Sequence, residues 1–350
     1  MSSDLRTDLL KRLTEERGVP GYEDRVRELI REELTRSTDR VRSDAMGNVV
    51  GTIEGDNDFE IVVAAHMDEI GFMVREVDED GFVGLDALGG WDPRVLRAQR
   101  VTIHTDDEDL TGIIGSTPPH VLDEEDLNKK PEIKDIYVDL GMSEKEARER
   151  VSPGDLVTMQ QTTVEMGDLI TGKALDDRVC VFAMLEAARA IENPPATIHF
   201  AATVQEEVGL RGARALGVDI DPDLAIALDV TLADDVPDSN GDSTITQLGD
   251  GTAIKLKDSS VITSPKVHRR LRAIAEDRSI PFQLEVLPVG GTDTAAFQVV
   301  SGATPVGAIS IPTRYLHTVT EAAHLDDIDA TIELLTSFLS TEDGSTDYTL

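Results

Sequence analysis

From residue 174 onwards, short apolar segments alternate with segments of helical periodicity, and this alternation limits the possible folds more than any other feature of the sequence. The expected strands span residues 196–207, 223–231, 281–290 and 304–318, and the expected helices span residues 176–191, 210–218, 264–280, 292–300 and 325–339. Strands that alternate with helices favour a largely parallel sheet covered by helices on both faces. The sequence therefore predicts an α/β fold with a mixed, largely parallel sheet.

The middle of the chain has a different character. Between residues 70 and 164, short β-type runs are separated by turn residues, and one short helix is expected at 143–151. We interpret residues 70–164 as a small β-barrel-like domain inserted into a larger domain, which residues 1–69 and 165–345 form. The last residues of the chain, 340–350, are polar and are expected to be frayed.

Polar residues of metal-ligand type stand where the expected strands end. They are His66 and Asp68 after one strand, Glu206 and Glu207 after another, Asp229 at the end of a third, and His317 beyond a fourth. Asp176 and Asp177 come immediately before an expected helix. Because the carboxyl ends of the strands form the ligand crevice of an open α/β sheet, all these residues are candidates for one site.

Two histidines and several carboxylates, with no cysteine among them, suit zinc, cobalt or manganese. Two such ions lie about 3.5–4 Å apart when one carboxylate bridges them. Such a pair would use most of the carboxylates and leave one glutamate free to take a proton from water. Structural interpretations stay open, since Asp176 and Asp177 can cap a helix and Asp229 can be a turn residue. Cys180 is expected in the core, and the role of His120 is undecided.

The charge of the chain excludes some partners. With 68 acidic and 33 basic residues, the net charge is -35, spread over the whole length. Nucleic acids and anionic membranes both require basic patches, so neither is expected as a partner. Of the basic residues 24 are Arg and 9 are Lys. Self-repulsion is largely screened at molar salt, so we expect a high-salt cytoplasm; an ordinary acidic protein is the alternative.

The sequence also predicts the compartment. A single cysteine excludes an internal disulfide framework and fits a reducing cytoplasm. No apolar run approaches the ~18 residues that span a bilayer. The first 18 residues contain no apolar signal core. We therefore expect a cytoplasmic protein that contacts no membrane.

Several stretches together resemble the M42 metallo-aminopeptidases of the tetrahedral (TET) type, which include deblocking and glutamyl aminopeptidases. The matching stretches cover nearly the whole chain in the family's order and include AAHMDEIGFMV, GGWDPRVLRAQRVTI, TGKALDDRV, TVQEEVGLRGA, AIALDVT, GGTDTAAFQ and GAISIPTRYLHT. The resemblance implies a zinc-exopeptidase-like catalytic domain, a dimerisation domain at residues 70–164, and dimers that assemble into a hollow homododecamer. Together with the charge, it suggests a halophilic archaeon as the source.

The resemblance also implies a metal site with two divalent ions per subunit, zinc or cobalt. Carried over residue by residue, His66 and Asp229 would bind the first metal, Glu207 and His317 the second, and Asp176 would bridge them. The same comparison implies how the nearby carboxylates act. Glu206 would be the general base, Asp68 would orient His66, and Asp177 would support the loop.

The implied activity is removal of N-terminal residues from short peptides that have a free α-amine. A two-metal amidase or carboxypeptidase is the main alternative. An endoglucanase-like hydrolase is less expected, since aromatic content is only 4% and sugar sites usually offer aromatic platforms. A non-enzymatic scaffold would bind no metal.

Overall fold

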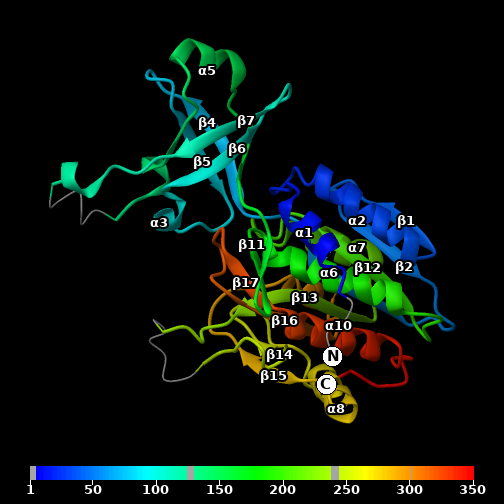
Figure 1. Cartoon of the computed structure of the whole chain (residues 1–350). Helices are drawn as coiled ribbons and strands as arrows, with labels where there is room; N and C mark the ends of the chain where they lie inside the picture. Colours follow the sequence, from blue (N-terminus) through cyan, green and yellow to red (C-terminus); the bar gives the residue numbers. More distant parts are fainter. Residues whose placement is uncertain (1–4, 124–129, 238–243, 301) are drawn as a thin grey trace.

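The computed structural model describes residues 5–123, 130–237, 244–300 and 302–350. Figure 1 shows an α/β body with a separate β-structure above it. The strands of the body form an 11-stranded sheet in the order β1 (Arg40–Ser43), β2 (Val49–Ile53), β12 (Thr197–Thr203), β3 (Glu60–His66), β13 (Leu224–Leu232), β16 (Val306–Arg314), β17 (Glu321–His324), β11 (Leu169–Gly172) and β10 (Val164–Met166), with β14 (Thr252–Lys257) on β16 and β15 (Phe282–Val286) on β14.

The centre of the sheet is parallel and its margins are mostly antiparallel. Strands β12, β3, β13 and β16 pair in parallel, whereas β2 pairs antiparallel with β12, and β14 and β17 pair antiparallel with β16. Central strands are almost wholly buried because helices cover both faces, and they are therefore rich in Val, Ile and Ala. The predicted mixed, largely parallel sheet is confirmed.

Successive residues of β3 show how the two faces are filled. Ile61, Val63 and Ala65 belong to one core, while Val62 and Ala64 belong to another, as the alternation of side chains along a strand requires. The first core also contains helices α1 (Thr7–Glu15), α2 (Asp24–Ser37), α6 (Leu175–Ala190), α8 (Pro265–Arg278) and α10 (Leu325–Leu339). The second core contains α7 (Arg211–Ile220) and α9 (Thr294–Val299).

Helix α6 is the central helix of the body. Its residues from Leu175 to Ala188 are all buried, and α1, α2, α10 and the sheet surround it. A helix that is apolar on every side can exist only inside a protein, which agrees with its run of Val, Phe, Met, Leu and Ala. Cys180 lies in this core, as predicted. The first turn of α6 carries Asp176 and Asp177 into the interior.

The inserted segment forms a closed barrel of antiparallel strands. Its strands follow the order β4 (Gly71–Val77), β5 (Val83–Leu88), β8 (Tyr137–Asp139), β7 (Asp109–Ile114), β6 (Gln99–His104) and β9 (Leu156–Met159). Its short helical pieces are α3 (Pro93–Leu96), η1 (Pro119–Val121), η2 (Ile133–Asp135) and α5 (Glu144–Arg150). The barrel has a core of its own, which confirms the predicted β-barrel-like insert. The domain boundaries at residues 69/70 and 164/165 stay a prediction.

An ion pair is buried where β14 meets the edge strand β15. Lys255 and Glu285 both have no exposed side-chain surface, and the Lys255 ammonium donates to the Glu285 carboxylate. The Thr231 hydroxyl donates to the same carboxylate over 2.7 Å. Leu284 and Val286, on either side of Glu285, are exposed.

Two local expectations need correction. The C-terminal residues are not frayed, because Tyr348 is buried in the main core and its hydroxyl donates to Glu342 over 2.6 Å. The polar composition of the segment concealed this single aromatic anchor. Strand β14 was not foreseen, because it is only six residues long and has a lysine, Lys255, at a buried position. Among the described residues, no helix is long and apolar enough to cross a membrane.

Candidate metal centre

The predicted site residues meet at the carboxyl edge of the four central parallel strands. His66 ends β3, Asp229 lies in the C-terminal half of β13, Glu206 and Glu207 follow β12, and His317 follows β16. Together with Asp176 they line one open pocket, whose lining is His66, Asp176, Glu206, Glu207, Gly209, Leu210, Asp229, Gly290, Gly291 and His317. Parallel pairing places the strand ends side by side, so residues distant in sequence converge.

Asp176 occupies the middle of the group. Its Oδ1 lies 3.2 Å from His66 Nε2, and its Oδ2 lies 3.4 Å from His317 Nε2. Each oxygen of one carboxylate therefore faces a different imidazole. Burial alone would raise the pKa of Asp176, but hydrogen bonds with His317 and His66 outweigh it and lower the pKa below its ordinary value.

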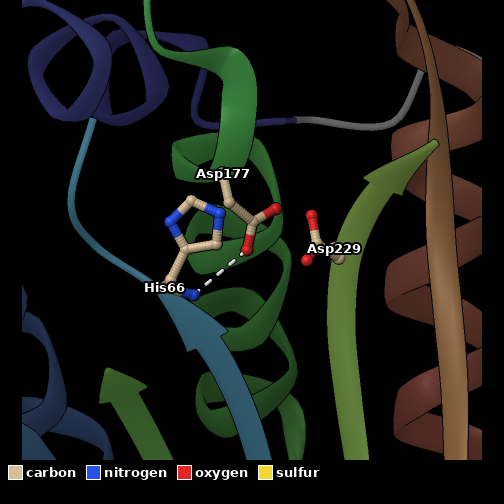
Figure 2. Close-up of side chains that lie close together, drawn as sticks. All are labelled: His66, Asp177 and Asp229. Carbon is tan, nitrogen blue, oxygen red and sulfur yellow. Dashed lines mark hydrogen bonds between the residues drawn. The ribbon is translucent and has the colours of Figure 1, made fainter. Parts of the chain in front are cut away.

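His66 belongs to two groups of ligand-type atoms. Ligand atoms of His66, Asp177 and Asp229 all lie within 4.8 Å of one another, as do those of His66, Asp176 and Glu207. Figure 2 shows the carboxylates of Asp177 and Asp229 facing each other, one from the start of α6 and one from β13. Asp177 Oδ2 accepts a hydrogen bond from the backbone N–H of His66 over 3.2 Å.

Glu206 and Glu207 are sequence neighbours with different surroundings. Glu206 Oε2 lies 3.9 Å from His66 Nε2, whereas Glu207 Oε2 lies 3.8 Å from His317 Nε2. Both backbone N–H groups donate to the carboxylate of Asp68, over 3.0 and 3.1 Å. Asp68 therefore fixes the position of both glutamates. It also contacts His66, whose Nδ1 lies 3.2 Å from the Asp68 carbonyl oxygen.

The donor set fits divalent metal ions. Burial and neighbouring carboxylates raise the pKa values of Glu207 and Asp229 to about 8. So many buried carboxylates need a positive partner, because isolated buried charges are very costly. Asp177 Oδ1 and Glu207 Oε1 are buried and have no hydrogen-bond partner among the residues that the structure describes. Unpaired acceptor oxygens beside two imidazoles are what cation coordination requires.

The sequence profile of the M42 glutamyl aminopeptidase family matches residues 47–334. This chain belongs to the M42 family. It is an aminopeptidase of the metallopeptidase class and hydrolyses peptides. The recognition of the family from sequence motifs is thereby confirmed, whereas an origin in a halophilic archaeon is not shown.

Three relatives of this M42 aminopeptidase are similar to it over almost their whole length. The lysyl aminopeptidase of Pyrococcus furiosus is 35% identical over 338 residues, which are 95% of this chain and 96% of the relative. An aminopeptidase structure from the archaeon Desulfurococcus kamchatkensis has 38% identity and a TM-score of 0.91, covering 96% of this chain and 94% of that one. The Pyrococcus horikoshii TET1 peptidase, which can assemble into a tetrahedron or a large octahedral shell, has 34% identity and a TM-score of 0.87, covering 96% and 99%.

Sequence reasoning missed Glu321, a carboxylate that braces the M42 site. It is 1% exposed and lies at the start of β17. One of its oxygens accepts from the backbone N–H of Asp176 over 3.0 Å, and the other from that of His317 over 2.9 Å. The signal that the sequence offered was an acidic residue followed by two alanines, four positions after His317.

Asp293 was also missed. It is 2% exposed, and its Oδ2 accepts a hydrogen bond from the Thr203 hydroxyl over 2.5 Å. Its Oδ1 is buried and has no hydrogen-bond partner within the described part of the chain, and burial raises its pKa to about 6. Its loop sequence GGTD belongs to one of the stretches that resemble the family, but no role was assigned to this aspartate.

The remaining histidines lie outside the pocket lining. His104 and His199 belong to strands and bond to Asp109 and Glu60, respectively. His268 lies in α8, and His324 precedes α10. His120 lies in η1 of the insert.

Proposed function

We propose that this M42 aminopeptidase removes N-terminal residues from short peptides at a centre of two divalent metal ions, zinc or cobalt. The observation that carries the proposal is the position of Asp176, whose two oxygens face two different imidazoles, those of His66 and His317. A carboxylate so placed suits a bridging ligand between two metals.

The ligands divide into two sets around Asp176. His66 and Asp229 would hold one ion, and Glu207 and His317 the other, while Asp177 supports the start of α6 and fixes the His66 backbone. When bound, the two ions would polarise the scissile carbonyl and lower the pKa of the attacking water.

Proton transfer falls to Glu206. Its side chain lines the pocket and faces His66. It is not one of the residues that would bind the two ions. Glu206 would take a proton from the attacking water and deliver it to the leaving amine. Asp68 acts indirectly by positioning the two glutamates, because its carboxylate accepts hydrogen bonds from the backbone N–H groups of Glu206 and Glu207.

Assembly and location are also proposed. The tetrahedral assembly of the Pyrococcus horikoshii relative supports dimers that join into a homododecamer here. The barrel would then be the dimerisation domain. The single buried cysteine supports a reducing cytoplasm.

A panel of aminoacyl chromogenic substrates tests the activity and its specificity. Substrates with a free α-amine should be cleaved, their N-blocked counterparts should not, and a chelator should abolish turnover. Activity should return when zinc or cobalt is added back. Equal cleavage of blocked and free substrates would favour the amidase or carboxypeptidase alternative, and activity that survives complete metal removal would refute the metal centre.

A further inference from the structure

His317 is held less firmly by its own segment than His66. It lies beyond the end of β16 with a backbone φ of 57°, in the left-handed region that is unfavourable for residues other than glycine. Its side chain is 41% exposed, whereas that of His66 is 2% exposed. Neither regular structure nor deep burial fixes the ring, so other contacts must do so.

The ring of His317 is oriented by a carbonyl group of the inserted barrel. His317 Nδ1 lies 2.7 Å from the carbonyl oxygen of Gly90. A carbonyl oxygen only accepts hydrogen bonds, so Nδ1 carries a hydrogen, and in the neutral ring that metal binding requires the lone pair lies on Nε2. That nitrogen is the one that faces Asp176 and Glu207, at 3.4 and 3.8 Å. His66 differs, because its Nδ1 contacts Asp68, two residues along its own segment.

The loop that carries Gly90 is anchored on the barrel. It connects β5 to α3, and Trp91 is its anchor. The indole N–H donates to the Gly71 carbonyl over 3.2 Å, and the indole stacks on Phe72 with ring centroids 5.2 Å apart. Phe72 is fully buried in the barrel core.

The contact between this loop and the site is too tight for a larger residue unless neighbouring atoms shift. A Cβ at Gly90 would lie 3.1 Å from His317 Nδ1. At Gly89, whose φ is +87°, a Cβ would lie 2.4 Å from a side-chain carbon of Ile70 and 3.3 Å from Glu207 Oε2. The segment after His317 is fixed by the same barrel, because Val319 is buried in the barrel core.

We infer that the Gly89–Trp91 loop of the barrel is a positioning element for the metal site of His317 and Glu207. The inference rests on the proposed two-metal centre and adds a task for the insert beyond dimerisation. The loop fixes the tautomer and direction of His317, while the site of His66 and Asp229 is oriented within the α/β body. Loss of the loop's anchor therefore weakens one metal site and spares the other.

The test is metal binding by full-length variants Trp91→Ala, Trp91→Phe and Gly90→Ala. Metal-free protein is titrated with cobalt, followed by visible absorption, and the content is checked by elemental analysis after dialysis. Trp91→Ala and Gly90→Ala should bind the second ion about 10–100-fold more weakly, as for other groups that orient metal ligands, with the first ion unchanged. Trp91→Phe keeps the stacking on Phe72 and should recover most of the affinity.

Tyr137→Ala is the matched control, because it removes an aromatic side chain from the same barrel that packs on Phe82. It should leave both ions bound as in the wild type. Equal affinities for both ions in Trp91→Ala and Gly90→Ala would overturn the inference. So would equal weakening of both sites, or the same loss in Tyr137→Ala. A wild-type protein that binds fewer than two ions would instead contradict the two-metal centre itself.

Discussion

At the scale of single residues, the site contains several carboxylates whose two oxygens bind different partners. Asp176 faces two imidazoles, Asp68 holds two backbone N–H groups, and Glu321 holds two more. Glu206 and Glu207 are adjacent but face different histidines. The proposed role of each carboxylate therefore depends on which partner each of its oxygens faces. Substitutions that keep the shape of a side chain but remove its charge can separate these roles.

Glu206→Gln should retain both metal ions and lose catalysis. The amide keeps the size of the side chain but cannot accept a proton, so kcat should fall by about 10²–10⁴-fold. Elemental analysis and kinetics with a free-amine substrate check the two halves of the prediction. Glu207→Gln is the control, and it should lose one metal ion. Full activity in Glu206→Gln would show that Glu206 is not the general base.

Glu321→Ala should destabilise the protein even when no metal is bound. The change leaves the backbone N–H groups of Asp176 and His317 without an acceptor in a buried site, and each such group costs about 1–3 kcal/mol. Glu321→Gln supplies one acceptor and should lose less. Denaturant unfolding of metal-free protein measures the effect, with the exposed Glu79→Gln expected to stay within about 0.5 kcal/mol of the wild type. Equal stability of Glu321→Ala and Glu79→Gln would contradict the bracing role.

The sequence predicted the side chains that line the pocket better than those that support it. The predicted residues lie near or just after the ends of strands, which can be recognised from local periodicity; they are His66, Glu206, Glu207, Asp229 and His317. Glu321 and Asp293 could not be found in this way, because their contacts to Asp176 and Thr203 cross long sequence distances. The hydrogen bond from His317 to Gly90 joins residues 227 positions apart, and no local pattern shows such a contact.

At the scale of elements, the N-terminus of α10 is attached to the loop before β14. Asp327 is fully buried in the first turn of α10, and its carboxylate accepts from the backbone N–H groups of Gly249 and Gly251, each over 2.8 Å. Burial nevertheless raises the pKa of Asp327 to about 6. The contribution of Asp327 to the stability of the folded state therefore decreases as its carboxyl group becomes ionised.

The pH dependence of Asp327→Asn tests this attachment. Because the folded-state pKa lies above the ordinary value, the unfolded chain ionises first, and the contribution of Asp327 to stability decreases as pH rises from about 4 to about 6. The stability of the wild type relative to the variant should be highest at pH ~4.5, where Asp327 is protonated in the folded protein, because the amide of the variant does not ionise as pH rises. The difference should shrink by on the order of 1–2 kcal/mol at pH ~7. Denaturant unfolding at both pH values measures it, and a gap that widens with pH would contradict the sign.

The order of elements was predictable to different degrees. Apolar runs with β-branched residues identified the central strands, because burial on both faces leaves a continuous apolar signal. Strand β14 escaped notice because Lys255 interrupts its apolar pattern, and only the buried partner Glu285 makes that lysine compatible with the interior. The closed barrel was expected from many short strands, but its strand order depends on pairings between distant segments.

At the scale of the whole molecule, the net charge of -35 acts on every part of the fold. Repulsion among acidic side chains opposes compaction, and salt reduces it because the screening length falls to about 3 Å at 1 M. The melting temperature should therefore rise between about 50 mM and about 3 M KCl. Light scattering over the same range reports whether subunit association also depends on salt. A melting temperature that is equal at both concentrations would refute the high-salt hypothesis and leave an ordinary acidic protein.

The buried pair of Lys255 and Glu285 has a consequence for strand register. Strand β15 is an edge of the sheet, and a slip by one residue would turn Glu285 to solvent and bring Leu284 or Val286 inward. Lys255 would then be an uncompensated charge in the interior, which costs about 3–5 kcal/mol. The ion pair thus rejects neighbouring alignments that apolar side chains alone would tolerate. The pair therefore specifies the register of the edge strand β15, because a shift of one position would destabilise the folded state.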